Sequence, residues 1–253
     1  MAFPIALLLR RGCLLAVVTA CEIGVIQGVY AHPVTATGVG AVVELFTSQG
    51  CSSCPPADRL LSALARAPNT IALSFPIDYW DFIGWHDTLA SPTFTARQKA
   101  YAAARGDGHV YTPQVVVDGL VDAVGSDQAQ IEHAIKANKG RESALSVSVH
   151  LTESGNILHI DIGAGPKVSA GVYIVRVVKS KTVLIGRGEN SGRSVTYTNV
   201  VRAFQKIGDW DGTARTYQLM ELKGYDEGYV VFLQKGSQAM PGVILAAAKS
   251  PGF

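Results

Sequence analysis

The feature that most constrains the fold is a cysteine pair, Cys51 and Cys54, set between a strand-like run and the start of a helix. The run from Ala41 to Phe46 is mostly apolar and rich in β-branched residues, which is typical of a buried strand. Two prolines follow Cys54, and proline is tolerated in the first helical turn because that turn needs no amide donors. The leucines that follow recur at helical spacing: Leu60, Leu61 and Leu64. We therefore expect the cysteines at the N-terminal end of a helix.

The N-terminal segment has the layout of an export signal. Two arginines precede an apolar run over residues 13–20, and a small-x-small pattern ends at Ala31. This pattern predicts a secretory signal over residues 1–31 that is cleaved after Ala31. As an alternative, residues 18–21 resemble a bacterial lipoprotein box, which makes residues 1–20 the signal and places a lipid on Cys21. Both alternatives predict an exported chain, periplasmic or secreted, that contacts the membrane only through that lipid.

Export changes the meaning of the cysteine count. The chain has four cysteines, and cleavage after Ala31 removes Cys13 and Cys21 and leaves only Cys51 and Cys54. Secreted scaffolds that depend on disulfides usually carry several bridges. A bridge between near neighbours stabilises little, because the entropy of loop closure grows with loop size. We therefore expect the pair to be kept for its reactivity.

Strands and helices continue to alternate as far as residue 140. The elements expected there are, in chain order, a strand over 71–77, an aromatic loop, a helix capped by Ser91, the dipeptide Thr112-Pro113, a strand over 114–117, a hairpin turn at Asp118-Gly119, a strand over 120–124 and a helix capped by Ser126.

This order resembles the thioredoxin superfamily. Two features carry the resemblance: the C-x-x-C motif at a strand-to-helix junction, and Thr112-Pro113 immediately before the hairpin. The resemblance implies an α/β thioredoxin-like domain over residues 38–140, in which Pro113 is cis and packs opposite the cysteines. It also implies that Thr112 and Pro113 offer an extended backbone edge to a bound peptide.

A closer resemblance covers most of the chain after the signal. The stretch 43–51, followed by residues 54–58 (Cys-Pro-Pro-Ala-Asp), is similar to the signature of a bacterial exported family of unknown function. Residues 78–81 and 188–190 are similar to other recurring stretches of that family. This resemblance implies the same fold and an exported setting, and it implies no activity.

The pattern changes after Gly140. Apolar and polar residues alternate over 145–151, and further strand-like runs follow a turn at residues 154–156. We therefore expect residues 143–253 to form an all-β, sandwich-like antiparallel domain. Asn190, Arg193, Trp210 and Asp211 are candidates for a recognition surface there. The alternative is that these four residues serve turns and strand ends.

The chemistry expected of the pair is thiol–disulfide exchange. Cys51 is the expected nucleophile, because free amides and the positive end of the helix dipole favour its thiolate. Cys54 is the expected resolving cysteine, and an exported setting favours a Cys51–Cys54 disulfide at rest. No cofactor is needed. The expected partners are protein thiols or disulfides, with a membrane redox protein among the candidates.

Four further side chains are candidates for supporting roles. Thioredoxins carry a buried acid that moves a proton for the resolving cysteine, and Glu44 occupies a similar strand, although it lies one residue further from Cys51. The alternative for Glu44 is a hydrogen-bonded carboxylate at a strand end. Tyr79 and Trp80, together with Trp85, are candidates for an apolar substrate-binding rim, and the alternative for them is the core.

Two other classes of function compete with exchange. One is a non-catalytic binding module in which Cys51–Cys54 is a static clip and the β domain carries recognition. The other is a copper(I)-handling protein, since thiolates suit that ion, with His86 or His109 as a third ligand. Neither histidine has diagnostic spacing, so no metal site is predicted. A net charge of +2 is too small to indicate a nucleic-acid partner.

Overall fold

A computed structural model describes residues 1–2, 38–220, 224, 226–251 and 253. The expected export signal, apart from Met1 and Ala2, therefore lies outside the described residues, as does the lipidation site expected at Cys21. Within the described ranges, no helix is both long enough and apolar enough to span a bilayer.

The first part of the chain folds in the order expected from the sequence. Its elements are β1 (Ala41–Thr47), α1 (Cys54–Leu64), β2 (Thr70–Pro76), the short 3-10 helix η1 (Asp81–Ile83), α2 (Pro92–Arg105), β3 (Gln114–Val117), β4 (Val121–Val124) and α3 (Gln128–Asn138). β1 runs parallel to β2 and antiparallel to β3, and β3 runs antiparallel to β4.

Local sequence signals explain most of these boundaries. Ser91 caps α2 by accepting a hydrogen bond from the Thr93 amide at 3.3 Å. Asp118 and Gly119 both have positive φ angles, 52° and 73°, as a tight Asp-Gly hairpin turn requires. The expected cap of α3 is wrong by one residue. Asp127 rather than Ser126 is the cap, because its carboxylate reaches the Gln130 amide at 3.0 Å.

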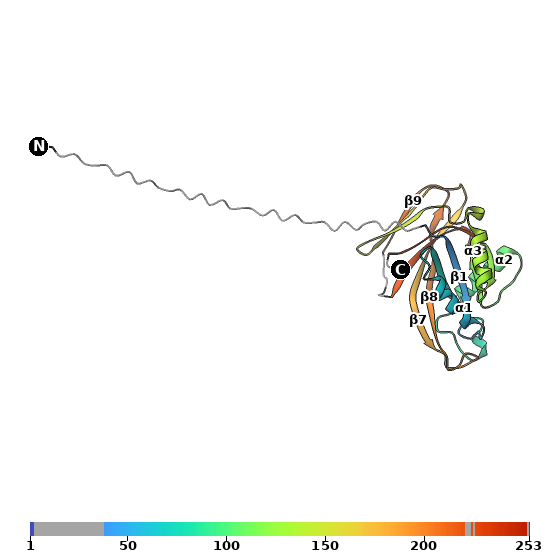
Figure 1. The fold of residues 1–253 in the computed structure, drawn as a ribbon. Helices are drawn as coiled ribbons and strands as arrows, with labels where there is room; N and C mark the ends of the chain where they lie inside the picture. The colour runs from blue at the N-terminus through green and yellow to red at the C-terminus, as the bar shows by residue number, and fades with distance from the viewer. Residues whose placement is uncertain (3–37, 221–223, 225, 252) are drawn as a thin grey trace. The chain divides into compact units, whose positions relative to one another are not determined.

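The second part is almost entirely strands. After η2 (Arg141–Ser143) come β5 (Val149–Ser154), β6 (Ile157–Ile162), β7 (Ala170–Leu184), β8 (Ser194–Trp210), β9 (Arg215–Met220), β10 (Glu227–Gly236) and β11 (Pro241–Lys249). β7 has 15 residues and β8 has 17 residues. These two strands form a long antiparallel ribbon (Figure 1).

One large sheet contains strands from both parts of the chain. Its order is β11-β10-β7-β8-β2-β1-β3-β4, and a second sheet has the order β5-β6-β9. β8 joins β2 through a single bridge between Ser74 and Val200, next to a side-chain bond in which Asn199 Nδ2 donates to the Ala72 carbonyl at 2.9 Å. The result is a mixed α/β protein with a large, mostly β sheet.

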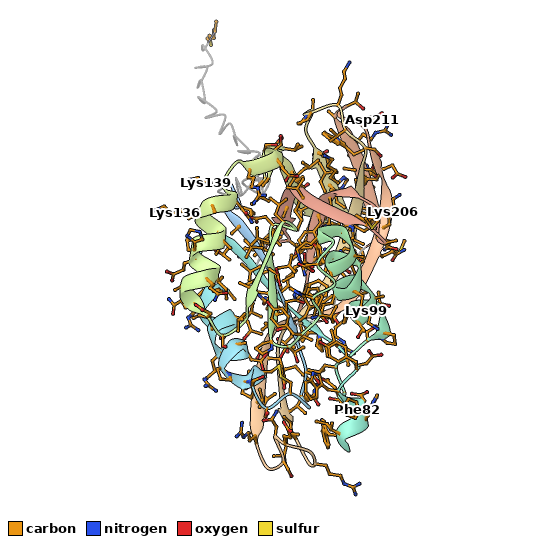
Figure 2. All side chains as sticks on the ribbon, turned by 90° about the vertical axis from the view of Figure 1, so that its right-hand side faces the viewer. Phe82, Lys99, Lys136, Lys139, Lys206 and Asp211 are labelled. Atoms are coloured by element: carbon orange, nitrogen blue, oxygen red, sulfur yellow. A yellow bond between two sulfur atoms is a disulfide. The ribbon has the colours of Figure 1, made fainter. Side chains whose placement is uncertain are left out.

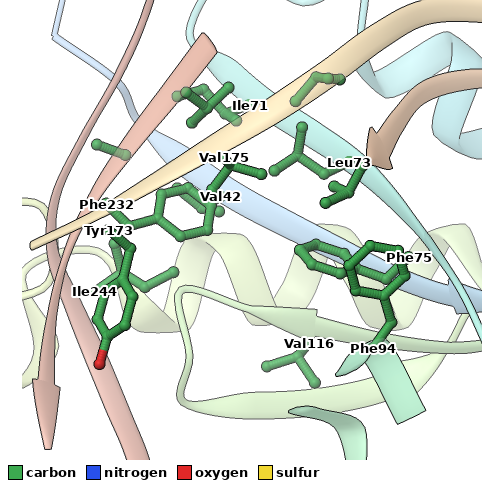
Figure 3. Packing of buried hydrophobic residues seen from close by; sticks show 14 of the residues in the cluster. Val42, Ile71, Leu73, Phe75, Phe94, Val116, Tyr173, Val175, Phe232 and Ile244 are labelled. Atoms are coloured by element: carbon green, nitrogen blue, oxygen red, sulfur yellow. The ribbon is translucent and has the colours of Figure 1, made fainter. Parts of the chain in front are cut away.

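The hydrophobic core also contains residues from both parts of the chain. In the cluster that α2 covers, Val42 and Phe75 from the first part pack with Tyr173 and Phe232 from the second (Figure 3). A second cluster lies beneath α1 and α3, and a third joins the three-stranded sheet to β7, β10 and β11. The segments over 38–140 and 143–253 therefore share one sheet and one core cluster.

Side chains alternate along β1 between two of these clusters. Residues 42, 44 and 46 face α2, whereas residues 43, 45 and 47 face α1 and α3. This alternation decides which buried polar groups can reach the cysteines.

Candidate functional site

The two cysteines form a disulfide at the N-terminal end of α1. Their Cα atoms are 5.4 Å apart, and Cys54 is the first residue of the helix. Cys51 and Cys54 are 1% and 0% exposed, although Ser52 and Ser53 between them are exposed. In this conformation the disulfide is therefore covered, and its immediate neighbours decide what can reach it.

The Thr112-Pro113 segment is one of these neighbours. Ser53 precedes α1 but makes no capping bond. Its hydroxyl instead lies 3.4 Å from the Cys51 sulfur and donates to the Thr112 carbonyl at 3.5 Å. The Thr112–Pro113 peptide bond is cis. The fold thus brings the x-Pro dipeptide to the cysteines across about 60 residues of chain.

The aromatic loop covers the turn before the cysteines. Trp80 Nε1 donates to Thr112 Oγ1 at 2.7 Å. A Cβ atom on Gly50 would lie 3.0 Å from Trp80 Cβ and 3.2 Å from Ile83 Cδ1, so the loop can pack this closely only against a glycine. Phe82 stacks on Trp80 and is 81% exposed (Figure 2).

The other aromatic candidates contribute less directly. Trp85 Nε1 donates to Gln49 Oε1 at 2.8 Å, which holds the loop to the residue two before Cys51. Tyr79 is partly buried against the core cluster that α2 covers, and burial raises the pKa of its hydroxyl. Trp80 and Trp85 therefore pack at the site, and Tyr79 and Trp80 both pack against this core cluster as well.

Asn190 reaches the site from the β7–β8 loop. Its Nδ2 atom donates to the Gln49 carbonyl at 2.9 Å and to the Cys51 carbonyl at 2.8 Å, and the residue is 1% exposed. Arg193 Nη1 donates to Asn190 Oδ1 at 3.0 Å and so orients the amide. In the sequence, the only signal for this contact is the Gly-Glu-Asn stretch at 188–190.

The other two candidates from the β segment lie apart from this contact. Trp210 is buried, and its Nε1 atom donates to the Gly163 carbonyl at 3.2 Å. Asp211 accepts hydrogen bonds from Thr213 and pairs with Arg215 at 3.1 Å. The structure therefore brings Asn190 and Arg193 together at the cysteines, while Trp210 and Asp211 serve the end of β8.

Glu44 is engaged on the other face of the sheet. Arg97 of α2 binds its carboxylate through Nε at 2.6 Å and through Nη2 at 2.9 Å, and the Tyr101 hydroxyl donates to it at 2.6 Å. Glu44 is one residue further from Cys51 than the resemblance to thioredoxins requires. Because strand side chains alternate, a shift of one residue reverses the face. Glu44 consequently faces α2, away from α1.

A second buried carboxyl lies on the α1 side, and sequence reasoning missed it. Asp58 is 2% exposed and accepts a hydrogen bond from Thr47 Oγ1 at 2.8 Å. Its Oδ2 atom has no hydrogen-bond partner among the described residues. Burial raises the pKa of Asp58 to about 7, and the nearby Asp87 adds to the rise, whereas the Thr47 hydrogen bond opposes it. The missed signal is the four-residue spacing from Cys54.

Asp87 organises the turn below the cysteines. Its carboxylate accepts hydrogen bonds from the amides of Gln49, Leu89 and Ala90 at 2.8, 2.8 and 3.1 Å. Burial raises the pKa of Asp87, and these backbone hydrogen bonds oppose the rise. Three amide donors in fixed positions identify Asp87 as a structural anchor.

Neither histidine joins the cysteines. His86 is 82% exposed and pairs with Asp81, and His109 lies in an exposed turn where its amide donates to Asp107 at 2.9 Å. Across the described part of the chain, no group of three or more His, Cys, Asp or Glu side chains is placed to hold a metal ion.

The fold and site define a mixed α/β protein with a covered disulfide at a strand-to-helix junction, to which both parts of the chain contribute. Residues 42–234 match the family described as "Protein of unknown function (DUF1223)", and the chain belongs to that family.

The chain is similar over most of its length to a solved structure. The crystal structure of a protein from Agrobacterium tumefaciens, a structural genomics target, is similar with a TM-score of 0.75 and 36% identity, over 84% of this chain and 94% of that one. An endonuclease/exonuclease/phosphatase from Beutenbergia cavernae matches over 42% of this chain and 23% of that one at 18% identity. The TM-score of that match is 0.19. No curated protein matches the chain.

Proposed function

We propose that this protein is an exported thiol–disulfide oxidoreductase with a thioredoxin-like arrangement around Cys51 and Cys54. The observation that carries the proposal is the position of the disulfide. It begins α1, directly after β1, and Ser53 links it to the Thr112 carbonyl. The proposed partners are protein thiols or disulfides, with a membrane redox protein among the candidates.

The order of the neighbouring strands supports the thioredoxin-like part of the proposal. Within the large sheet, β2-β1-β3-β4 is a continuous block in which only β1 and β2 are parallel. α1 connects the two parallel strands, and the hairpin of β3 and β4 follows Pro113. The chain order of these elements is the one on which the resemblance to thioredoxins rests.

The chemistry follows from the helix end. A partner thiolate attacks one sulfur of the disulfide, the Cys51–Cys54 bond breaks, and a mixed disulfide forms while the other cysteine leaves as a thiolate. In the opposite direction, the Cys51 thiolate attacks a partner disulfide and Cys54 releases the product. The start of a helix favours a thiolate through its dipole and its free amides.

The covering of the disulfide sets a condition on this reaction. With Cys51 only 1% exposed, a partner reaches its sulfur only after a neighbouring segment moves aside, and we propose that this segment is the aromatic loop packed against Gly50. Trp80 holds this loop to Thr112 through a side-chain bond, and Phe82 is the exposed aromatic side chain at its surface. A partner that packs against Phe82 would open access to the sulfur.

Trapping tests the proposal. A Cys54→Ser variant should hold Cys51 as mixed disulfides with exported proteins, which are recovered by affinity purification under acid-quenched, non-reducing conditions. The matched control is Cys51→Ser, which keeps one cysteine but lacks the proposed nucleophile. Equal recovery from both variants, or recovery from neither, would refute the proposal.

The same burial favours a second candidate, a binding module with a static disulfide. Cys51 and Cys54 at 1% and 0% exposure are as covered as structural cysteines. The two candidates differ in redox equilibrium. Structural disulfides usually have potentials below about −300 mV, whereas exchange-active pairs lie higher. Equilibration of the full chain in glutathione buffers, with quantitation of the Cys51–Cys54 dithiol by mass, distinguishes them.

A further inference from the structure

We propose that Asp58 accepts the proton of the Cys54 thiol when Cys54 resolves a mixed disulfide, and returns it when the pair is reduced. This inference rests on the proposed function. It assigns to Asp58 the role that the sequence suggested for Glu44.

The first observation is position along α1. Cys54 and Asp58 are separated by four residues, so their Cβ atoms lie about 6 Å apart on one face of the helix. Both residues are buried on that face. Glu44, by contrast, faces α2 and is held by Arg97.

The second observation is an unpartnered oxygen. Thr47 Oγ1 donates to Asp58 Oδ1, but Oδ2 has no partner among the described residues, and the whole side chain is buried. A buried carboxylate oxygen without a donor is costly, and binding a proton removes the cost because the neutral acid tolerates burial. Asp58 is thus the buried group near Cys54 that has free capacity for a proton.

The charges around Asp58 favour the neutral acid near neutral pH. From the loop before α2, Asp87 raises the pKa of Asp58; from α1 itself, Arg59 lowers it. From β8, the Tyr197 hydroxyl faces both carboxyls, and its own pKa is raised by burial and then by Asp58 and Asp87. β2 carries no titratable side chain. The resulting pKa of about 7 suits a group that takes and returns protons.

The proposed step is balanced. The Cys54 proton moves to Asp58, the Cys54 thiolate attacks the Cys51 sulfur, the bond from Cys51 to the partner breaks, and the partner leaves as a thiolate. The two cysteines are oxidised and the partner is reduced. When a partner thiolate later breaks the Cys51–Cys54 bond at Cys51, Asp58 returns the proton to the departing Cys54 sulfur.

A chromogenic aromatic disulfide, dithiobis-nitrobenzoate, separates the two steps. We use the full chain with Cys13→Ser and Cys21→Ser, reduced beforehand. The first thionitrobenzoate reports attack by Cys51, and the second reports resolution by Cys54. In the parent chain the rate of the second release should rise with pH and level off above about 7.

Two variants test the assignment. Asp58→Asn should slow the second release by about 10²-fold at pH 8 and remove the break near neutral pH, while the first release changes little. Thr47→Val keeps the carboxyl but removes the hydrogen bond that lowers its pKa, so the break should move to higher pH. If Asp58→Asn does not fold, the pH profile of Thr47→Val by itself tests the role of Asp58.

The outcomes separate the two proposals. If the parent chain never releases the second thionitrobenzoate, the pair is static and the proposed function is wrong. If the parent releases it and both variants keep the parent pH profile, the pair exchanges and only the role of Asp58 is overturned.

Discussion

Removal of one partner from the buried ion pair between Glu44 and Arg97 should strongly destabilise the protein, and Arg97→Leu tests this. The two side chains are 0% and 6% exposed and meet through two hydrogen bonds of 2.6 and 2.9 Å. Arg97 also donates to Tyr101 and to Gln234 of β10, and its guanidinium lies 4.1 Å from the centre of the Phe204 ring. One side chain therefore links β1 and α2 to strands of the second part.

The expected cost follows from what remains after the change. Leucine fills part of the space but leaves the Glu44 carboxylate buried with only the Tyr101 hydroxyl as a donor. Removing one partner of a buried pair typically costs about 3–5 kcal/mol, because the other charge is left uncompensated. Replacing both partners removes that charge, so Glu44→Leu combined with Arg97→Leu should cost clearly less than the sum of the single changes.

Urea unfolding followed by circular dichroism measures these free energies. Arg66→Leu is the matched control, because Arg66 is exposed and makes a long hydrogen bond of 3.5 Å to Ser62. Its replacement should change stability by less than about 0.5 kcal/mol. A loss below about 1 kcal/mol for Arg97→Leu, or strict additivity in the double variant, would show that no uncompensated buried charge is left at Glu44.

Three further predictions concern pH, access and cooperativity. The pKa of Asp58 is raised from 3.8 to about 7, so the folded state binds this proton more tightly than the unfolded state. This proton therefore contributes its full stabilisation below pH 3.8, and the stabilisation is lost as the pH rises to about 7. Asp58→Asn, which cannot ionise, should therefore gain up to about 4 kcal/mol relative to the parent between pH 4 and pH 8 in urea titrations, and a pH-independent difference would contradict this. Asn190→Ala removes two hydrogen bonds to the segment before α1, so dithiothreitol should reduce the disulfide roughly tenfold faster. The exposed control Ser191→Ala should be reduced at the parent rate. Equal rates for the two variants would contradict a role of Asn190 in covering the disulfide. In Trp210→Phe the remaining tryptophan fluorescence comes from Trp80 and Trp85. Because both parts of the chain share a core, this variant should show the same urea midpoint by fluorescence and by circular dichroism. Two separate midpoints would indicate independent domains.

Local patterns in the sequence predict the first part of the fold well, because its elements depend on near neighbours. The Ser91 cap, the Asp118-Gly119 turn and the strand before Cys51 each need only a few consecutive residues to be recognised. The same holds for the cysteine pair at the start of α1. The exact capping residue of a helix is harder to predict. Ser126 and Asp127 are both good cap residues, and only the backbone geometry selects Asp127.

Local patterns could not predict toward which side of the sheet the buried acid Glu44 points. Alternation predicts that neighbours in β1 point to opposite faces, but not which face α1 covers. That choice places Glu44 with Arg97 and leaves Asp58 as the buried carboxyl on the helix of Cys54. The raised pKa of Asp58 then depends on desolvation and on Asp87, which are properties of the packed protein.

Patterns of consecutive residues indicate the elements around the disulfide, the spacing of the cysteines and the chemistry that a thiol pair at a helix start favours. The packed protein alone shows that β8 joins β2, that the two parts share a core, and that Asn190 holds the Cys51 carbonyl. These features follow from strand pairing and burial, which are contacts between distant segments. An alternating run of residues says that a strand will form, but its partner is set by which surfaces remain to be covered.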